Sequence, residues 1–134
     1  MQIEWGDCDP AGIVFYPRYF AMFDHSTTML ITWACGVSHH ELLRTRDFVG
    51  YPMVDTRARF MIPCRFGDDV TIETGFAKIG RSSFDVEHRL LKNGQLCAEG
   101  FETRVWVGRD PQDSSKIKSK PIPDDLVGRF RSQP

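Results

Sequence analysis

The first third of the chain has helical periodicity. From Tyr16 on, side chains that suit a buried stripe recur at steps of three and four residues. Pro17 suits the first helical position, because proline has no N–H to leave unpaired, and Gly36 suits the residue that ends a helix. The pattern predicts a long helix with one stripe to bury: Phe20, Phe23, Thr27, Leu30 and Ala34.

A second, shorter helix is expected directly afterwards. Ser38 and Glu41 are spaced as a capping box, in which each side chain satisfies a free backbone N–H of the first turn. We therefore predict a helix from Ser38 to about Arg46. The pair His39-His40 is interpreted as part of this first turn rather than as a metal or catalytic site.

After Phe48 the period changes to two, which is typical of strands with one buried face. We predict strands over residues 54–62, 70–79, 84–91 and 95–107. Asn93-Gly94 lies between the last two and favours a tight hairpin, because a type I′ turn needs positive φ at both positions. The expected buried faces of the first two strands are Val54, Thr56, Ala58, Phe60 and Ile62, and Val70, Ile72, Thr74 and Phe76.

The two ends of the chain have weaker patterns. Residues 2–5 resemble the end of a strand, and residues 6–15 a loop. Residues 108–134 are polar and rich in proline at first, which predicts a mobile or surface-hugging tail, with one helical turn at 126–130.

This order of elements favours an α+β architecture. One helix has one apolar stripe, and the strands together present one apolar face, so an antiparallel sheet wrapped around the helix buries both. A length of 134 residues fits a single domain over residues 1–134. The unpaired edge of such a sheet also favours pairing with a second copy.

Composition excludes several classes of function. A net charge of -1 gives no reason to expect nucleic acid or an anionic membrane as a partner. No apolar run has the length of a membrane helix, and the first residues lack a signal-peptide pattern. The cysteines are too far apart for a zinc site or a small disulfide framework. We expect reduced thiols and a cytoplasmic location: Cys8, Cys35, Cys64 and Cys97.

The stretch "DCDPAGIVFYP" (residues 7–17) combines two carboxylates with a turn just before the long helix. The simplest interpretation is an acidic turn that interacts favourably with the helix dipole. A calcium loop of the EF-hand type is excluded, because Ala11 and Arg18 occupy positions that need oxygen ligands.

A catalytic interpretation rests on the helix start. Tyr16 occupies the N-cap position of the expected helix, where it supplies no side-chain acceptor for the free N–H groups. Free N–H groups at the positive end of a helix dipole can stabilise developing negative charge. Asp9 is held close by the Pro-Ala-Gly turn, so a carboxylate and an oxyanion site come together, as acyl transfer from a thioester requires.

Several blocks of the chain resemble the 4-hydroxybenzoyl-CoA thioesterase family of the hot-dog fold. The most specific is "GDCDPAGIVFYPRYFAMFD" (residues 6–24), and looser matches follow in order: "GYPMV" (50–54), Phe60, Cys64, "DDVTIET" (68–74) and "GRSSF" (80–84). The resemblance implies a long helix wrapped by an antiparallel sheet, and protomers whose sheets join edge to edge as a homodimer or homotetramer. It implies active sites at the dimer interface that hydrolyse acyl-CoA or aryl-CoA thioesters, such as 4-hydroxybenzoyl-CoA, without a metal or other cofactor.

The resemblance also assigns the catalytic residues. Asp9 matches the family's catalytic carboxylate, which acts as nucleophile or general base. The Tyr16 backbone N–H matches the donor that polarises the thioester carbonyl. Asp7 is interpreted as a structural residue.

Further positions match the family's substrate site. Tyr51, Pro52 and Met53, with Asp24 on the long helix, match the acyl pocket. The sequence departs from the aryl-specific members at Gly80, where one arginine of their phosphate-binding pair is absent. The remaining matches to the coenzyme A phosphate loop are Arg81, Ser82 and Ser83.

Other functions stay open at this point. A dehydratase of the same fold would be expected to carry a catalytic histidine near the helix start, where this chain has Tyr16, Pro17 and Arg18. A non-catalytic module that binds acyl-CoA or acyl carrier protein would not need Asp9. A scaffold attached to an envelope complex is a further alternative.

Overall fold

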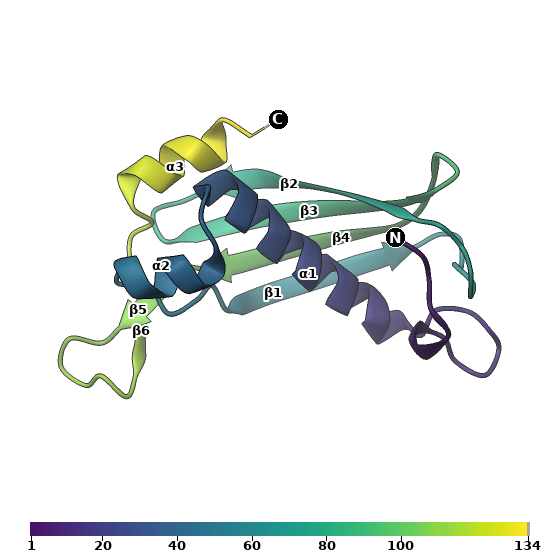
Figure 1. Ribbon diagram of the computed structural model, residues 1–134, viewed down its shortest axis with the longest axis horizontal. Helices are drawn as coiled ribbons and strands as arrows, with labels where there is room; N and C mark the ends of the chain where they lie inside the picture. The colour runs from purple at the N-terminus through teal and green to yellow at the C-terminus, as the bar shows by residue number, and fades with distance from the viewer. Residues whose placement is uncertain (134) are drawn as a thin grey trace.

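The computed structural model describes residues 1–133, which form a four-stranded antiparallel sheet with a long helix lying across one face (Figure 1). The helices are α1 (Tyr16–Cys35), α2 (His39–Thr45) and α3 (Asp124–Arg131), preceded by one 3-10 turn (Trp5–Asp7). The main sheet has the order β1-β4-β3-β2, and β5 and β6 form a separate small hairpin. The strands are β1 (Met53–Phe60), β2 (Thr71–Ile79), β3 (Ser83–Lys92), β4 (Gln95–Val105), β5 (Val107–Arg109) and β6 (Ile117–Ser119).

The helix boundaries follow local sequence signals. Gly36 ends α1 with φ 73, and its N–H reaches the carbonyls of Thr32 and Trp33. Only glycine adopts this left-handed conformation freely. The N–H of Glu41 donates to the Ser38 side chain at the start of α2. Both predicted helices are therefore confirmed, and so is the role of Ser38.

The sheet confirms the predicted α+β class and most of the predicted strands. Asn93 and Gly94 have φ values of 52 and 76, as the type I′ hairpin between β3 and β4 requires. Alternate residues of each strand point toward α1, and the core lies between helix and sheet. Near the start of α1, Phe23 packs with Leu90 and Cys97 in a buried cluster.

A second buried cluster lies toward the end of α1. It joins Ile31 on α1 and Phe84 on β3 to Trp106, and it includes Leu126 and Phe130 of α3. The sequence predicted a polar tail with one helical turn for the C-terminal segment, but the segment is more structured than that. It contributes a two-stranded hairpin and an eight-residue helix whose apolar side covers the end of the sheet.

Two further expectations were wrong. Residues 2–5 do not end a strand, because only Gln2 makes an isolated bridge, to Asp69, and Trp5 begins the 3-10 turn. The predicted buried face of the first long strand is largely exposed, with Val54 at 59% and Phe60 at 48%. The reason is position, since β1 is an edge of the sheet and has a neighbouring strand, β4, on one side only.

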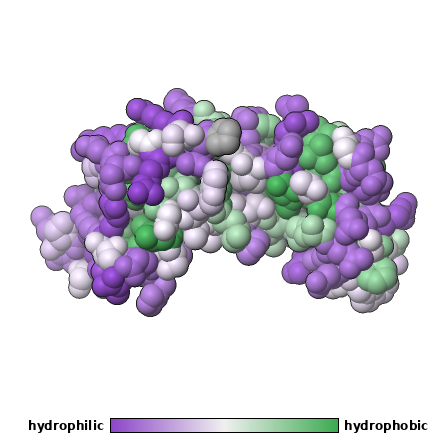
Figure 2. Space-filling view, turned by 45° about the horizontal axis from the view of Figure 1, so that its top comes forward, coloured by the Kyte–Doolittle hydropathy of each residue, from purple (hydrophilic) through white to green (hydrophobic). Residues whose placement is uncertain are grey.

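Some apolar side chains thus remain on the surface. Figure 2 shows apolar patches that interrupt the polar surface of the face drawn. Besides β1, the outer side of α1 carries two large exposed side chains, Met29 and Trp33, four residues apart and therefore neighbours on the helix.

The cysteines are free thiols. Burial raises the pKa of the Cys35 and Cys64 thiols to about 11, so both stay protonated at neutral pH. Within residues 1–133, no helix is both long enough and apolar enough to cross a membrane.

The contact of α1 with β4 depends on Gly100. A Cβ at this position would lie 2.6 Å from the Phe23 ring. We predict that Gly100→Ala lowers the free energy of unfolding by about 1–3 kcal/mol, as overpacking typically does. Gly128 in α3 has no atom within 4 Å of a Cβ, so Gly128→Ala should raise the same quantity by up to about 1 kcal/mol. Urea denaturation of both variants measures these changes. Equal changes in the free energy of unfolding would contradict the role of Gly100.

Candidate active site

The loop before α1 folds back on itself as a tight hairpin. Cys8 and Val14 form a bridge, and the N–H of Asp9 donates to the Ile13 carbonyl at 2.9 Å. Inside the turn, the Gly12 N–H donates to the Asp9 carbonyl, and Gly12 has φ 80. The Asp9 side chain is partly buried and accepts the Ala11 N–H on Oδ1 at 2.8 Å. One carboxylate oxygen therefore fixes the orientation of Asp9, and Oδ2 accepts no hydrogen bond from residues 1–133.

The hairpin leads directly into α1, whose start differs by one residue from the expectation. Phe15, not Tyr16, is the N-cap, and it offers no side-chain acceptor. Tyr16 is the first helical residue, and Pro17 after it has no N–H. Within residues 1–133, the Tyr16 amide N–H donates to no acceptor. An uncommitted donor thus lies at the positive end of a helix of 20 residues, the position that favours negative charge.

Asp7 has a different environment, although it is only two residues from Asp9. Its Oδ2 accepts the N–H of Glu4 at 2.9 Å, and its Oδ1 pairs with the Arg18 guanidinium at 3.1 Å. Both oxygens are used to hold the loop against α1. This arrangement agrees with the structural role expected for Asp7.

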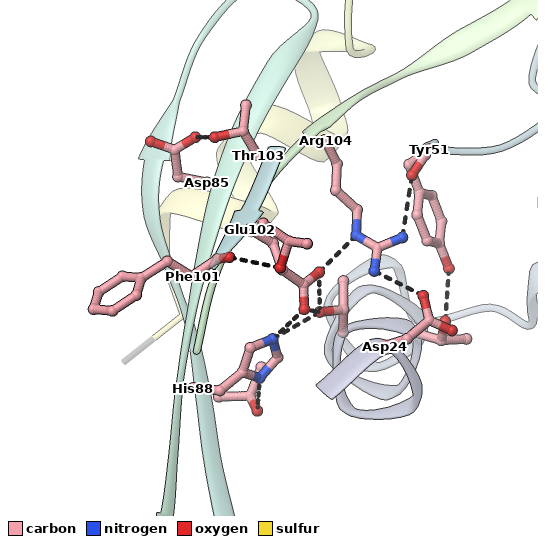
Figure 3. A network of polar contacts seen from close by, with 12 residues as sticks. Asp24, Tyr51, Asp85, His88, Phe101, Glu102, Thr103 and Arg104 are labelled. Carbon is pink, nitrogen blue, oxygen red and sulfur yellow. Dashed lines mark hydrogen bonds and ion pairs between the residues drawn. The ribbon is translucent and has the colours of Figure 1, made fainter. Parts of the chain in front are cut away.

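Asp24 lies on α1 and is the exposed end of a polar network that runs into the core (Figure 3). Its Oδ1 accepts a hydrogen bond from Nη2 of Arg104 on β4 at 2.7 Å. The same guanidinium donates through Nη1 to the Tyr51 carbonyl at 3.3 Å and lies over the Tyr51 ring. The structure therefore brings together Asp24 and Tyr51, two residues expected to line the acyl pocket, and the link is Arg104.

Arg104 is connected in turn to Glu102 and His88. Arg104 Nε donates to Glu102 Oε1 at 2.7 Å, and the other Glu102 oxygen meets His88 Nε2. Thr27 on α1 donates to the same carboxylate at 2.9 Å. Burial acts to raise the pKa of Glu102, but the hydrogen bonds and charges of His88 and Arg104 outweigh it. The pKa of Glu102 therefore lies below its usual value, and the carboxylate is ionised.

Sequence reasoning did not identify this network. A signal was present, because Glu102 and Arg104 occupy the same face of β4 as Ala98, a buried core residue. Charged residues at inward-facing positions of a strand need partners. Their partners are separated by 14 to 80 residues along the chain, so the pairing itself could not be inferred from spacing.

The other residues of the expected acyl pocket lie where the chain enters β1. Tyr51 is buried, and its hydroxyl donates to Thr28 on α1 at 3.4 Å. Burial raises the pKa of this phenol, so it stays protonated. The Pro52 carbonyl accepts the Val105 N–H, and Met53 begins β1 with 38% of its surface exposed. Pro52 and Met53 are thus both accessible, whereas Tyr51 is not.

The loop expected to bind coenzyme A phosphates lies at the far end of the sheet. The Gly80 N–H donates to the Ser83 carbonyl, and a Cβ at residue 80 would lie 3.0 Å from Ser83 Oγ, so the turn favours glycine there. The Ser82 carbonyl accepts the Trp106 N–H. Arg81 lines a surface hollow of about 580 Å³ that Arg131 of α3 also lines. Within residues 1–133, neither guanidinium is paired with a carboxylate.

The candidate residues therefore form two groups. Asp9 and Tyr16 lie at the start of α1, whereas Arg81 lies beside α3 at the opposite end of the molecule (Figure 1). A helix of 20 residues spans about 30 Å, which separates the two groups in one protomer. In the part of the chain that the structure describes, no His, Cys, Asp and Glu side chains form a cluster suited to a metal ion.

Sequence comparisons find relatives of this chain. Residues 3–130 match the family model of the thioesterase-like superfamily. The chain is 30% identical over 132 residues to 4-hydroxybenzoyl-CoA thioesterase from Pseudomonas sp. (strain CBS-3), covering 94% of this chain and 91% of the relative. It is 29% identical over 124 residues to 1,4-dihydroxy-2-naphthoyl-CoA hydrolase from Synechococcus elongatus, covering 92% and 87%.

Solved structures show the same fold. A gentisyl-coenzyme A thioesterase matches with a TM-score of 0.83 and 32% identity over 98% of both chains. A 4-hydroxybenzoyl-CoA thioesterase variant, complexed with 4-hydroxybenzoyl-CoA, matches with a TM-score of 0.86 and 29% identity over 97% of this chain and 94% of the other. The chain has the hot-dog fold and belongs to the thioesterase-like superfamily, in the same family as 4-hydroxybenzoyl-CoA thioesterase.

Proposed function

We propose that this protein is an acyl-CoA thioesterase whose reaction takes place between Asp9 and the Tyr16 amide. Two observations carry the proposal: Asp9, on the turn before α1, has a free carboxylate oxygen, and the N–H at the start of α1 is uncommitted. The named relatives are thioesterases or hydrolases of CoA esters, which supports the same reaction class here.

The chemistry has two possible routes with the same residues. In one, an Asp9 oxygen attacks the thioester carbonyl carbon, the coenzyme A thiolate leaves, and water then hydrolyses the mixed anhydride. In the other, Asp9 removes a proton from water as the water attacks the same carbon. In both, the carbonyl oxygen becomes negatively charged, and the Tyr16 N–H with the helix dipole stabilises that charge.

The acyl group is proposed to lie along α1 between Tyr16 and Asp24. These residues are eight positions apart, or about 12 Å along the helix, and side chains lean toward the helix N-terminus. Tyr51, Pro52 and Met53 form the other side of this pocket. The relatives act on hydroxylated aryl groups by name, so we propose an aryl-CoA substrate.

We further propose that the active unit is at least a homodimer joined through β1, with a tetramer as a pair of such dimers. β1 is an edge strand with exposed apolar side chains. Antiparallel pairing of two β1 strands would place Arg81 of one protomer at the end of the sheet where its partner holds Asp9. Ser82 and Ser83 would contribute to the same phosphate site. The free thiols fit a cytoplasmic protein.

The role of Asp9 can be tested with Asp9→Asn. Asparagine keeps the oxygen that accepts the Ala11 N–H, so the loop should fold unchanged. Loss of the carboxylate should lower kcat for aryl-CoA hydrolysis by about 100-fold or more. The matched control is Asp7→Asn, which should lower stability through loss of the Arg18 ion pair but keep turnover close to wild type. A folded Asp9→Asn variant with full activity would remove Asp9 from the mechanism.

The same variant separates an enzyme from a binding module. We expect wild type to turn over members of a thioester panel, and Asp9→Asn to bind them without turnover. Binding without turnover by wild type would instead favour a non-catalytic module for acyl-CoA or acyl carrier protein.

Phosphate recognition can be tested with Arg81→Ala. Loss of a charged hydrogen bond to phosphate should raise KM for CoA esters by about 10-fold. Thioesters of N-acetylcysteamine lack the nucleotide, so their KM should not change. Arg89→Ala is a suitable control, because Arg89 is exposed on β3 and pairs only with exposed Glu73 within residues 1–133. Equal changes for both classes of substrate would contradict the assignment.

The proposed interface can be tested with Val54→Lys, which places a charge on exposed apolar surface of β1. We expect weaker dimerisation, measured by light scattering over a range of concentrations, and a parallel loss of activity. Ile117→Lys on β6 changes a side chain of similar exposure, 56% against 59%, away from β1. The interface would be elsewhere if Ile117→Lys dissociated the oligomer and Val54→Lys did not.

A further inference from the structure

Asp24 and Arg104 form an unusual ion pair, because one partner is exposed and the other is buried. The side chains are 60% and 6% exposed. An ion pair between two exposed side chains usually contributes little, since both lose conformational freedom when they pair. Here the buried guanidinium has little freedom to lose. It can therefore hold the exposed carboxylate in one orientation.

The orientation of Arg104 is fixed by acceptors on all of its nitrogens. Nε donates to Glu102 at 2.7 Å, Nη1 to the Tyr51 carbonyl at 3.3 Å, and Nη2 to Asp24 at 2.7 Å. The guanidinium is planar, so three acceptors in different directions define its plane and its rotation. Lysine has one nitrogen and could not replace this arrangement.

Glu102 is held just as firmly on its other side. The Glu102 carboxylate is ionised and can only accept, so both the Thr27 hydroxyl and His88 Nε2 donate to it. His88 Nδ1 lies 2.8 Å from Thr74 Oγ1 on β2, and the imidazole stacks on the Phe23 ring. The support for Asp24 thus extends through three strands of the sheet.

This support leaves part of Asp24 free. Arg104 uses Oδ1, and Oδ2 accepts no hydrogen bond from residues 1–133. A carboxylate can only accept, so its ligand must be a donor such as a hydroxyl group. Burial acts to lower the pKa of Arg104, but Asp24 and Glu102 outweigh it and raise this pKa, so the charge facing Asp24 is permanent.

We propose that Arg104 is a positioning residue for substrate selection. Held by Glu102 and His88, it aims the free oxygen of Asp24 at a hydrogen-bond donor on the far end of the acyl group. The proposal rests on the proposed function, in which Asp24 lines the acyl pocket, but it assigns a role to a buried residue that touches no substrate.

The test compares 4-hydroxybenzoyl-CoA with benzoyl-CoA, which differ only in the hydroxyl group. Wild type should prefer the hydroxylated ester in kcat/KM by about 10-fold or more, as expected for a hydrogen bond to a charged acceptor. Arg104→Lys and Asp24→Asn should each remove most of this preference, and the double variant should lose no more than Asp24→Asn alone. Each variant should lower kcat/KM for 4-hydroxybenzoyl-CoA more than kcat/KM for benzoyl-CoA.

Arg46→Lys is the matched control. Arg46 also binds a carboxylate through two nitrogens, at 3.0 and 2.7 Å from Asp125, but it lies on the connection after α2, outside the network. Its variant should keep the full preference. If Arg104→Lys fails to fold, Glu102→Gln loosens the same guanidinium one step further from the substrate and should weaken the preference.

The outcomes separate the two proposals. Equal loss of activity toward both esters in a folded Arg104→Lys variant would reduce Arg104 to a structural residue, and an unchanged preference would overturn the proposal directly. Equilibrium binding of the matching thioether analogues, which cannot be hydrolysed, provides a second readout. If wild type bound the hydroxylated analogue more tightly without any turnover, the proposed enzymatic function would be removed. Loss of that binding preference in Arg104→Lys would still support the role of Arg104.

Discussion

The packing of α1 against the inner face of the sheet is the contact on which the rest of the structure depends. Gly100 has no side chain, so the Phe23 ring can lie directly against β4. This close approach also brings Thr27 within 2.9 Å of Glu102 and Asp24 within 2.7 Å of Arg104. A wider gap between helix and strand would break these contacts together, because they share one interface.

The charged groups in that interface do not have to stabilise the fold in order to be useful. Burying an ion pair loses hydration that its attraction often only just repays, and an apolar replacement can be equally stable. What the network provides is a defined geometry, since each donor and acceptor of Arg104 and Glu102 restricts the next. The only member with substantial exposure is Asp24.

The loop before α1 shows how two similar residues acquire different roles. Asp7 and Asp9 are both carboxylates in one short hairpin, yet Asp7 uses both oxygens for protein contacts and Asp9 uses one. A carboxylate with a free oxygen is able to take part in chemistry, whereas one whose oxygens both accept protein hydrogen bonds can only hold the loop. The hydrogen bonds of the folded loop, and not the residue type, separate the two.

The sequence by itself determined the elements that depend on neighbouring residues. Helix α1 with its Gly36 end, helix α2 with its Ser38 cap, and the Asn93-Gly94 hairpin follow from side-chain period and backbone preference, which act over a few residues. The resemblance of residues 6–24 to a known family then identified Asp9 and Tyr16 as the candidate catalytic residues. Only the tertiary structure decided that β1 is a largely exposed edge, that α3 covers the core, and that Arg104 reaches Asp24. Those features depend on contacts between residues as many as 80 positions apart, and no local pattern encodes which distant partner a side chain will meet.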